Sequence, residues 1–193
     1  MESVFTQGSF HAFSYRSLDE ARLPVIEYSQ YAPARTTVFI SHKHDDLEDL
    51  KDIIGFLQQR FRVKVYIDSQ DPALPKTISP VTALTIRQRI EQCNKFILLA
   101  TNNAIESKWC NWELGYGDAR KFKEHIALFP LKPAGTLDSS YRGTEYMSIY
   151  PSIAYYDGTE RIDGILVPKG YYVQQKEGDS YQITPLNEWF RAR

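Results

Sequence analysis

The amino-acid sequence predicts an α/β fold in which helices cover both faces of a doubly wound, parallel sheet of about five strands. In the middle of the chain, short apolar runs alternate with longer segments whose apolar residues recur at helical spacing. One run, residues 96–100, is apolar at every position, as is typical of a central strand buried on both faces. With 193 residues, of which 42% are hydrophobic, the chain is long enough to enclose a large core.

Each predicted element has its own signal. Short runs rich in valine, isoleucine, leucine and phenylalanine indicate strands, whereas apolar residues three or four positions apart indicate helices. Asp45 and Asp46 precede the first helix, where negative charge complements the helix dipole. Prolines punctuate the loop at residues 68–80, before the second helix. In chain order, the predicted elements are a strand at residues 38–40, a helix at 47–61, a strand at 63–67, a helix at 81–93, a strand at 96–100, a helix from 107 and a strand at 126–131.

Strands that alternate with helices in this way are typical of a flavodoxin-like sheet. Residues 153–156 predict a fifth strand, at which we expect the sheet to end. A hairpin is expected near residues 177–180, followed by a short helix with Thr184 as N-cap and Pro185 in its first turn. We divide the chain into an N-terminal extension packed on the core (1–35), a main domain (36–160) and a C-terminal hairpin and helix that complete the same domain (161–193).

The composition argues against several partners. The net charge is −1, and 23 basic residues are scattered among 24 acidic ones, without the basic run that nucleic-acid binding requires. No segment approaches the roughly 20 apolar residues of a membrane span, and the N-terminus lacks the pattern of a secretion signal. We therefore expect a cytoplasmic protein that binds neither nucleic acid nor membrane. Cys93 and Cys110 lack metal-ligand spacing and are expected to be reduced thiols.

Several familiar sites are missing or incomplete. The sequence has no Gly-x-x-x-x-Gly-Lys and no Gly-x-Gly-x-x-Gly after the first strand, which excludes a P-loop and a standard Rossmann dinucleotide site. Response-regulator phosphoacceptor domains share this fold class but end the third strand on an aspartate, where this chain has Thr101. The histidines and aspartates of residues 42–46 would need ligands from another segment to bind a metal, so no metal is expected.

The most informative stretch is residues 107–117, an aromatic-rich turn that leads into a helix. Ser107 is expected to cap this helix, so that Glu113 falls in its second turn. The aromatic residues share one helical face, which we expect to be buried, and Glu113 projects roughly 80° from its centre, at the edge of the buried stripe. The residues of that face are Trp109, Trp112, Tyr116 and Ala119.

The predicted topology places this stretch beside other polar loops. Ligands of open parallel sheets bind at the carboxyl ends of the strands. The third of the converging loops leads into the helix that carries Glu113, which has aromatic residues on both sides. We therefore expect a binding cleft at this edge. The four loops are residues 41–45, 68–80, 101–109 and 132–133.

Three motifs, in this order, resemble those of Toll and interleukin receptor (TIR) domains. Residues 38–42, followed by acidic residues, resemble box one of that family, and the loop from Asp68 resembles the BB loop. The most specific is Trp109-Cys110-x-x-Glu113-Leu114, which is similar to a segment of plant and bacterial TIR domains. The resemblance covers roughly residues 36–160 and extends to the standalone TIR proteins of Thoeris antiphage defence.

In that family the glutamate is the catalytic residue of NAD+ cleavage, so the resemblance implies that Glu113 is catalytic. NAD+ is then a substrate, and no cofactor is expected. This chain departs from the family pattern in its BB loop, which lacks a common glycine, and at His42, where many members carry an aromatic residue. The residues expected to bind the substrate are Phe39, Ser41, His42, Lys43, Asp68, Lys76 and Trp109.

A single carboxylate suits this chemistry. Nicotinamide leaves NAD+ as a neutral molecule and needs no proton from a general acid, so one half of the usual glycosidase pair is dispensable. Positive charge develops on the ribose, and a carboxylate in a water-poor cleft can stabilise it.

The resemblance therefore implies an NAD+ nucleosidase or ADP-ribosyl cyclase that releases nicotinamide and a signal nucleotide derived from ADP-ribose. Its implied partners are further copies of the chain, through TIR–TIR contacts that close the NAD+ site, and a separate effector that senses the product. The alternative is a non-catalytic module that binds other TIR domains. Trp112 and Cys110 are expected in the core, Trp109 either in the core or on the cleft wall, and Lys43 and Lys76 either at the substrate or on the surface.

Overall fold

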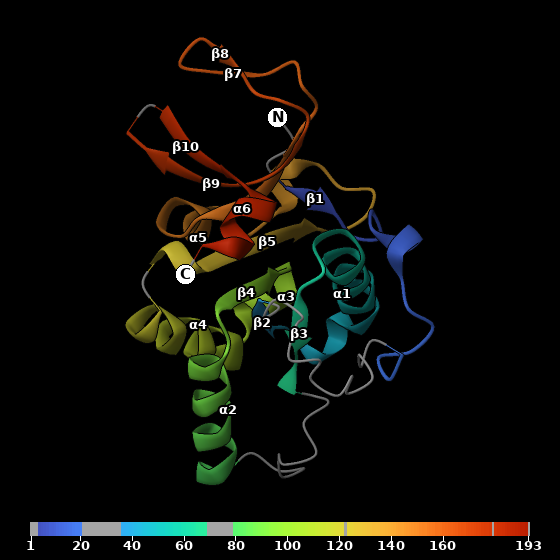
Figure 1. The fold of residues 1–193 in the computed structure, drawn as a ribbon. Coiled ribbons are helices and arrows are strands. Elements are labelled where there is room, and N and C mark those ends of the chain that lie inside the picture. The colour runs from blue at the N-terminus through green and yellow to red at the C-terminus, as the bar shows by residue number, and fades with distance from the viewer. Residues whose placement is uncertain (1–3, 21–35, 69–78, 122, 179, 193) are drawn as a thin grey trace, which may run out of the picture.

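A mainly parallel sheet forms the centre of the computed structural model, which describes residues 4–20, 36–68, 79–121, 123–178 and 180–192. The strand order is β10-β9-β6-β5-β4-β2-β3, and β1 pairs with β5 off this path (Figure 1). β7 and β8 form a separate hairpin. The strands are β1 (Phe5–Thr6), β2 (Thr37–Ser41), β3 (Lys64–Tyr66), β4 (Lys95–Ala100), β5 (Ile126–Lys132), β6 (Ser152–Tyr156), β7 (Arg161–Ile162), β8 (Ile165–Leu166), β9 (Gly170–Glu177) and β10 (Ser180–Pro185).

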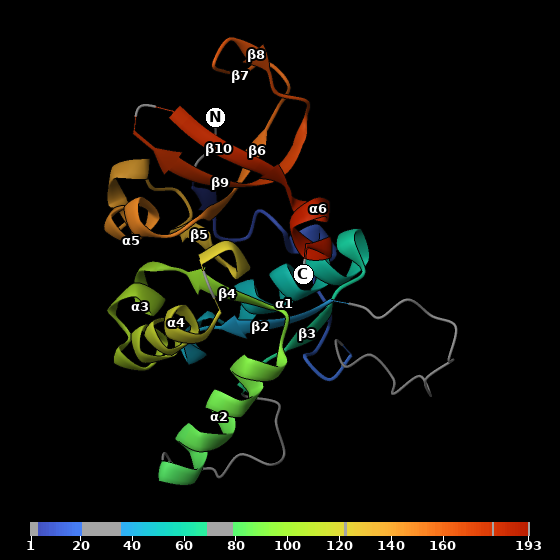
Figure 2. The same cartoon turned by 60° about the vertical axis from the view of Figure 1, so that its left-hand side comes forward.

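Helices cover both faces of the sheet, as expected (Figures 1 and 2). Alternate residues of β2 serve the two faces: Val38 and Ile40 pack with α1, whereas Phe39 packs with α2 and α4. α6 joins the α1 side through Leu186. The helices are α1 (Leu47–Phe61), α2 (Pro80–Gln92), α3 (Asn102–Glu106), α4 (Lys108–Arg120), α5 (Thr144–Ile149) and α6 (Leu186–Arg191).

The predicted α/β fold is confirmed, but the prediction that the sheet ends at β6 is wrong. β9 pairs antiparallel with β6, and β10 pairs antiparallel with β9. These strands cover backbone groups that would otherwise be exposed at the edge of β6. The expected hairpin is therefore present, but as part of the main sheet. Thr184 lies in β10 opposite Val173, and α6 begins only after Pro185.

The described part of the N-terminal segment packs on the α1 side of the sheet. Phe5 and Phe10 belong to the same core cluster as Phe56, and the rings of Phe10 and Phe56 are 4.7 Å apart. Gly55 lies where this segment crosses α1, and a Cβ atom there would come within 1.9 Å of the Phe13 carbonyl oxygen. The glycine therefore permits a close approach that no other residue would allow.

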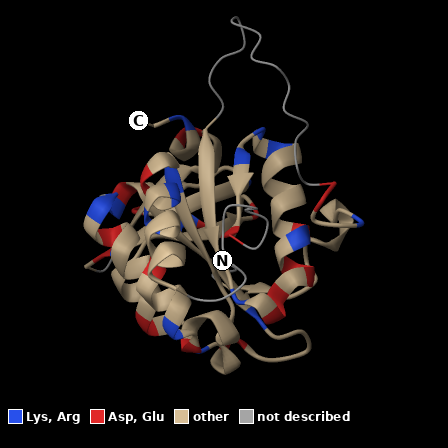
Figure 3. Ribbon diagram, turned by 90° about the horizontal axis from the view of Figure 1, so that it is seen from below, with Lys and Arg blue, Asp and Glu red and all other residues tan. Residues whose placement is uncertain are grey.

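Charges of both signs are interspersed along the helices and loops (Figure 3). Within the ranges described above, no helix is both long enough and apolar enough to cross a membrane.

Candidate active site

Glu113 lies in the middle of the buried face of α4, not at its edge as helical periodicity predicts. The residue is only 1% exposed. The aromatic residues predicted to form the buried face are instead only half-buried, and Ala119 is exposed. The residues of α4 that face the sheet are Cys110, Glu113, Leu114 and Gly117.

Close packing explains which face of α4 meets the sheet. A Cβ atom on Gly117 would lie 3.2 Å from the Phe96 ring, so the helix approaches β4 closely at this glycine. Trp112 and Tyr116 contact α2, where the Arg87 guanidinium lies 5.4 Å from the Trp112 ring centre and 5.3 Å from that of Tyr116. The face of α4 that carries Glu113 is therefore the one that packs on the sheet.

The Glu113 carboxyl is held at the carboxyl end of β2. The Ser41 hydroxyl, on the last residue of β2, donates a hydrogen bond of 2.5 Å to Glu113 Oε2. The other oxygen, Oε1, is buried and has no hydrogen-bond partner among the described residues. Because buried polar atoms are normally paired, Oε1 is suited to accept a hydrogen bond from a bound ligand.

Burial controls the protonation of this carboxyl group. It raises the pKa of Glu113 to about 8, and the negative charge of Asp68 raises this pKa further in the same direction, while Ser41 and Trp109 oppose the shift. The group is therefore mostly neutral at pH 7 in the free protein. A cation brought close to it would favour the ionised form.

Asp68, whose charge acts on Glu113, lies close to His42, the residue that follows Ser41 in the chain. The His42 Nδ1 atom is 3.7 Å from Asp68 Oδ1 and has no hydrogen-bond partner in the described structure. Burial lowers the pKa of His42, although the Asp68 charge opposes this. The ring is thus neutral at pH 7. Two buried polar atoms, Glu113 Oε1 and His42 Nδ1, therefore have no hydrogen-bond partner in the described part of the chain.

A second polar cluster holds the loops around the site. The Thr101 hydroxyl donates to Asp46 Oδ2 at 2.5 Å and accepts the Ala104 amide at 3.0 Å, which caps α3. The Asn103 amide donates to Asp46 Oδ1 at 2.9 Å. These bonds tie the loop after β2 to the loop after β4. This role of Asp46 was not predicted from the sequence, although a threonine directly after a strand is a typical helix N-cap.

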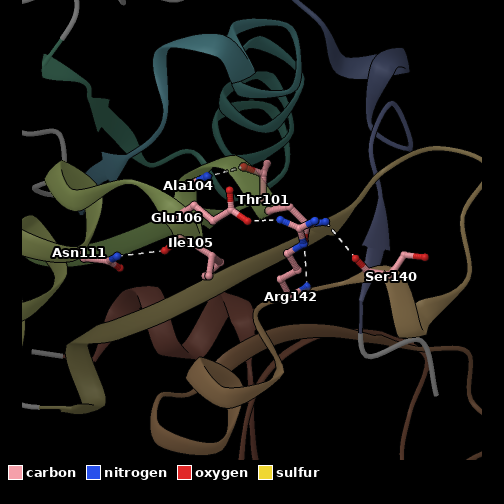
Figure 4. Close-up of polar contacts among 8 residues, drawn as sticks. Thr101, Ala104, Ile105, Glu106, Asn111, Ser140 and Arg142 are labelled. Atoms are coloured by element: carbon pink, nitrogen blue, oxygen red, sulfur yellow. Dashed lines mark hydrogen bonds and ion pairs between the residues drawn. The ribbon is translucent and has the colours of Figure 1, made fainter.

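The segment after β5 is tied to the same helix. The Asn102 side chain donates to the Ser140 carbonyl oxygen at 2.9 Å and accepts the Arg142 amide at 2.9 Å. The Arg142 guanidinium forms an ion pair with Glu106 at the end of α3 (Figure 4). Side chains therefore connect the carboxyl ends of β2, β4 and β5.

The remaining predicted substrate-binding residues differ in their surroundings. Phe39 is fully buried, with its ring 5.5 Å from those of both Phe96 and Tyr66, so it supports the site from the core. Lys43 is half-buried in the loop after β2. Trp109 is half-buried and stacks on Trp112 with ring centres 4.8 Å apart.

Two further sequence expectations concern Cys110 and Lys76. Cys110 is 1% exposed, and burial raises the pKa of its thiol, so it acts as a packing residue as expected. Lys76 lies outside the described residues. Within those residues, no group of three or more histidine, cysteine and carboxylate side chains gathers as a metal site would require.

Comparison with known protein families identifies the chain. A sequence model of the TIR domain matches residues 38–161. The chain belongs to the TIR-domain family. In this TIR domain, Ser41 of the first motif donates its hydrogen bond to Glu113 of the third, and the charge of Asp68, in the second, acts on the same carboxyl group.

Two curated TIR-domain relatives carry names that describe an activity. The chain is 27% identical over 165 residues to "Probable 3' cyclic ADP-D-ribose synthase ThsB'" from Bacillus cereus (strain MSX-D12), covering 79% of this chain and 83% of that protein. It is 32% identical over 82 residues to "Putative cyclic ADP-D-ribose synthase TIR2" from Cytobacillus dafuensis, covering 41% of this chain and 21% of that protein. This TIR domain is therefore related to proteins named as cyclic ADP-ribose synthases.

Proposed function

We propose that this TIR domain cleaves the bond between nicotinamide and ribose in NAD+ and releases nicotinamide with a cyclic form of ADP-ribose. One observation carries the proposal: the buried Glu113 carboxyl group, which Ser41 holds by one oxygen while the other has no partner among the described residues. The names of the two relatives support the same substrate and product class.

The carboxylate stabilises the positive charge that develops on the ribose and does not donate a proton. When the C–N bond breaks, both electrons pass to the pyridinium nitrogen, so that neutral nicotinamide leaves and positive charge remains on the ribose. Glu113 Oε1 accepts a hydrogen bond from a ribose hydroxyl, and the carboxylate stabilises this cation in a water-poor site. The interaction strengthens as charge develops, which is the requirement for lowering the barrier.

The raised pKa of Glu113 fits both halves of this reaction. The cationic pyridinium of NAD+ favours the ionised carboxylate on binding, and Asp68 adds further negative charge beside the site. A hydroxyl group of the same ADP-ribose molecule then captures the ribosyl cation and loses its proton. A carboxylate with a pKa of about 8 is basic enough to accept that proton.

Nicotinamide release from NAD+ by purified protein tests the assignment. We expect Glu113→Ala and Glu113→Gln to lose activity by about 100-fold or more, as for removal of a group that stabilises transition-state charge. Glu48→Gln is the matched control, because Glu48 is exposed on α1 and pairs only with Lys51 in the described structure. Equal rates for all four proteins would exclude catalysis by Glu113 and favour the non-catalytic module.

Mass spectrometry of the product separates cyclisation from hydrolysis, since the cyclic product is lighter than ADP-ribose by one water molecule. If the product is entirely linear ADP-ribose, the protein is an NAD+ nucleosidase and the cyclase part of the proposal is overturned. In the proposed pathway, the cyclic nucleotide acts on a separate effector protein in antiphage defence.

Assembly of several copies through TIR–TIR contacts is part of this proposal. α2 extends away from the sheet (Figures 1 and 2), and its outer half exposes Val81 and Leu84 by 59% and 55%. Exposed apolar groups of this kind favour association with another protein surface. Specific activity is expected to rise with protein concentration, and a constant value in a protein that light scattering shows to be monomeric would contradict this.

A further inference from the structure

A separate hollow of about 480 Å³ lies on the α1 side of the sheet. Arg60 and Phe61 at the end of α1 form one wall, and Tyr155 of β6 and Tyr171 of β9 form another. α6 lies beside the end of α1 (Figure 2), where the rings of Phe61 and Phe190 are 5.5 Å apart. Phe61 and both tyrosines pack on the core of this face, whereas the neighbours of Glu113 on α4 pack on the opposite face.

The lining combines positive charge with aromatic rings. Its charged residues are Arg60 and Lys169, and no acidic side chain is among the described residues that line it. Both cations are exposed, and neither forms an ion pair with a residue that the structure describes. The rings of Tyr155 and Tyr171 lie 5.0 Å apart and provide an aromatic wall. The volume falls within the range of about 300–1,000 Å³ that is typical of small-molecule sites.

We propose that this hollow binds a nucleotide. Arg60 and Lys169 bind its phosphate groups, because guanidinium and ammonium groups are the usual protein partners of phosphate. The base packs against the tyrosine rings, since aromatic side chains stack on nucleobases. A small inorganic anion would leave the aromatic wall unused, and an apolar ligand would bring no charge to the two cations. The site is independent of Glu113 and does not rest on the proposed NAD+ cleavage.

Calorimetric titration with ADP tests the site in the full chain carrying Glu113→Ala, so that catalysis cannot interfere. We expect saturable binding that weakens at least tenfold in Arg60→Ala and in Lys169→Ala. Lys176→Ala is the matched control, because Lys176 is an exposed lysine on β9 that does not line the hollow. Circular dichroism and thermal melting verify that each variant is folded.

Adenosine and inorganic diphosphate identify the parts of the ligand that matter. Both should bind at least tenfold more weakly than ADP, because each lacks one half of the contacts. Diphosphate binding as tight as ADP would show a plain anion site and overturn the proposal. The proposal would also be overturned if Arg60→Ala and Lys169→Ala left the ADP affinity unchanged, or if ADP did not bind at millimolar concentration. None of these results bears on nicotinamide release, which the Glu113 variants test separately.

Discussion

Ser41→Ala provides a sharp test of how the site controls the protonation of Glu113. The hydrogen bond from Ser41 to Glu113 Oε2, 2.5 Å long, favours the ionised carboxylate, whereas burial raises the pKa to about 8. If ionised Glu113 is needed, kcat/KM for nicotinamide release should rise with pH through a midpoint near that pKa, since this parameter reports groups of the free enzyme.

Removing the serine hydroxyl should move this midpoint upward. A hydrogen bond to a charged group contributes about 1.5–3 kcal/mol, and one pH unit corresponds to about 1.4 kcal/mol. The midpoint of Ser41→Ala is therefore expected about one to two pH units above that of the wild type, with most of the activity recovered at high pH. Ser148→Ala, in an exposed serine of α5, should leave the profile unchanged.

The pH profile can also refute this reasoning. A wild-type midpoint below pH 6 would show that the buried carboxyl is not the titrating group. A midpoint that stays in place or moves down in Ser41→Ala would show that the serine does not favour the carboxylate. A loss of rate that is equal at every pH would assign Ser41 to substrate positioning instead.

Three further predictions concern stability. Glu113 binds its proton more tightly in the folded protein than a solvent-exposed glutamate does with its ordinary pKa of 4.5. The free energy of unfolding of the wild type should therefore fall as pH rises from about 4.5 to 8. Glu113→Gln should not show this fall, and urea unfolding at pH 9 should find it more stable than the wild type by about 2 kcal/mol. Gly55→Ala should lower the free energy of unfolding by about 1–3 kcal/mol in chemical denaturation, because the new Cβ would collide with the backbone of the N-terminal segment. Gly115→Ala, which has open space around its Cβ, should be neutral or slightly stabilising. Thr101→Val should cost about 1–3 kcal/mol by removing the α3 cap and leaving buried Asp46 short of a donor, and an unchanged melting temperature would contradict this.

Local patterns predicted the alternation of strands and helices because each signal lies within a few neighbouring residues. The cap at Ser107, whose hydroxyl accepts the Cys110 amide at 3.3 Å, is such a signal and is confirmed. The antiparallel strands β9 and β10 were recognised as a hairpin, yet their pairing with β6 was not predicted. Any extended segment can pair with an open edge, so the partner depends on the whole chain.

The buried face of α4 shows why helical periodicity alone was insufficient. Hydrophobicity favoured Trp109, Trp112 and Tyr116 as the buried face, but the helix meets the sheet through Cys110, Glu113, Leu114 and Gly117, and at Gly117 it comes too close to Phe96 for a larger side chain. The large rings find their contacts against α2 instead. A helix that packs against two neighbouring elements buries the face whose side chains are complementary in shape to both of them.

By itself, the sequence determined the order of the elements and the motif that carries Glu113, since periodicity, caps and motifs are local in the chain. Only the tertiary structure decided that Ser41 meets Glu113, 72 residues away, and that burial raises the pKa of this carboxyl group. The physical reason is that desolvation and contacts between distant segments arise only when the sheet and α4 pack together.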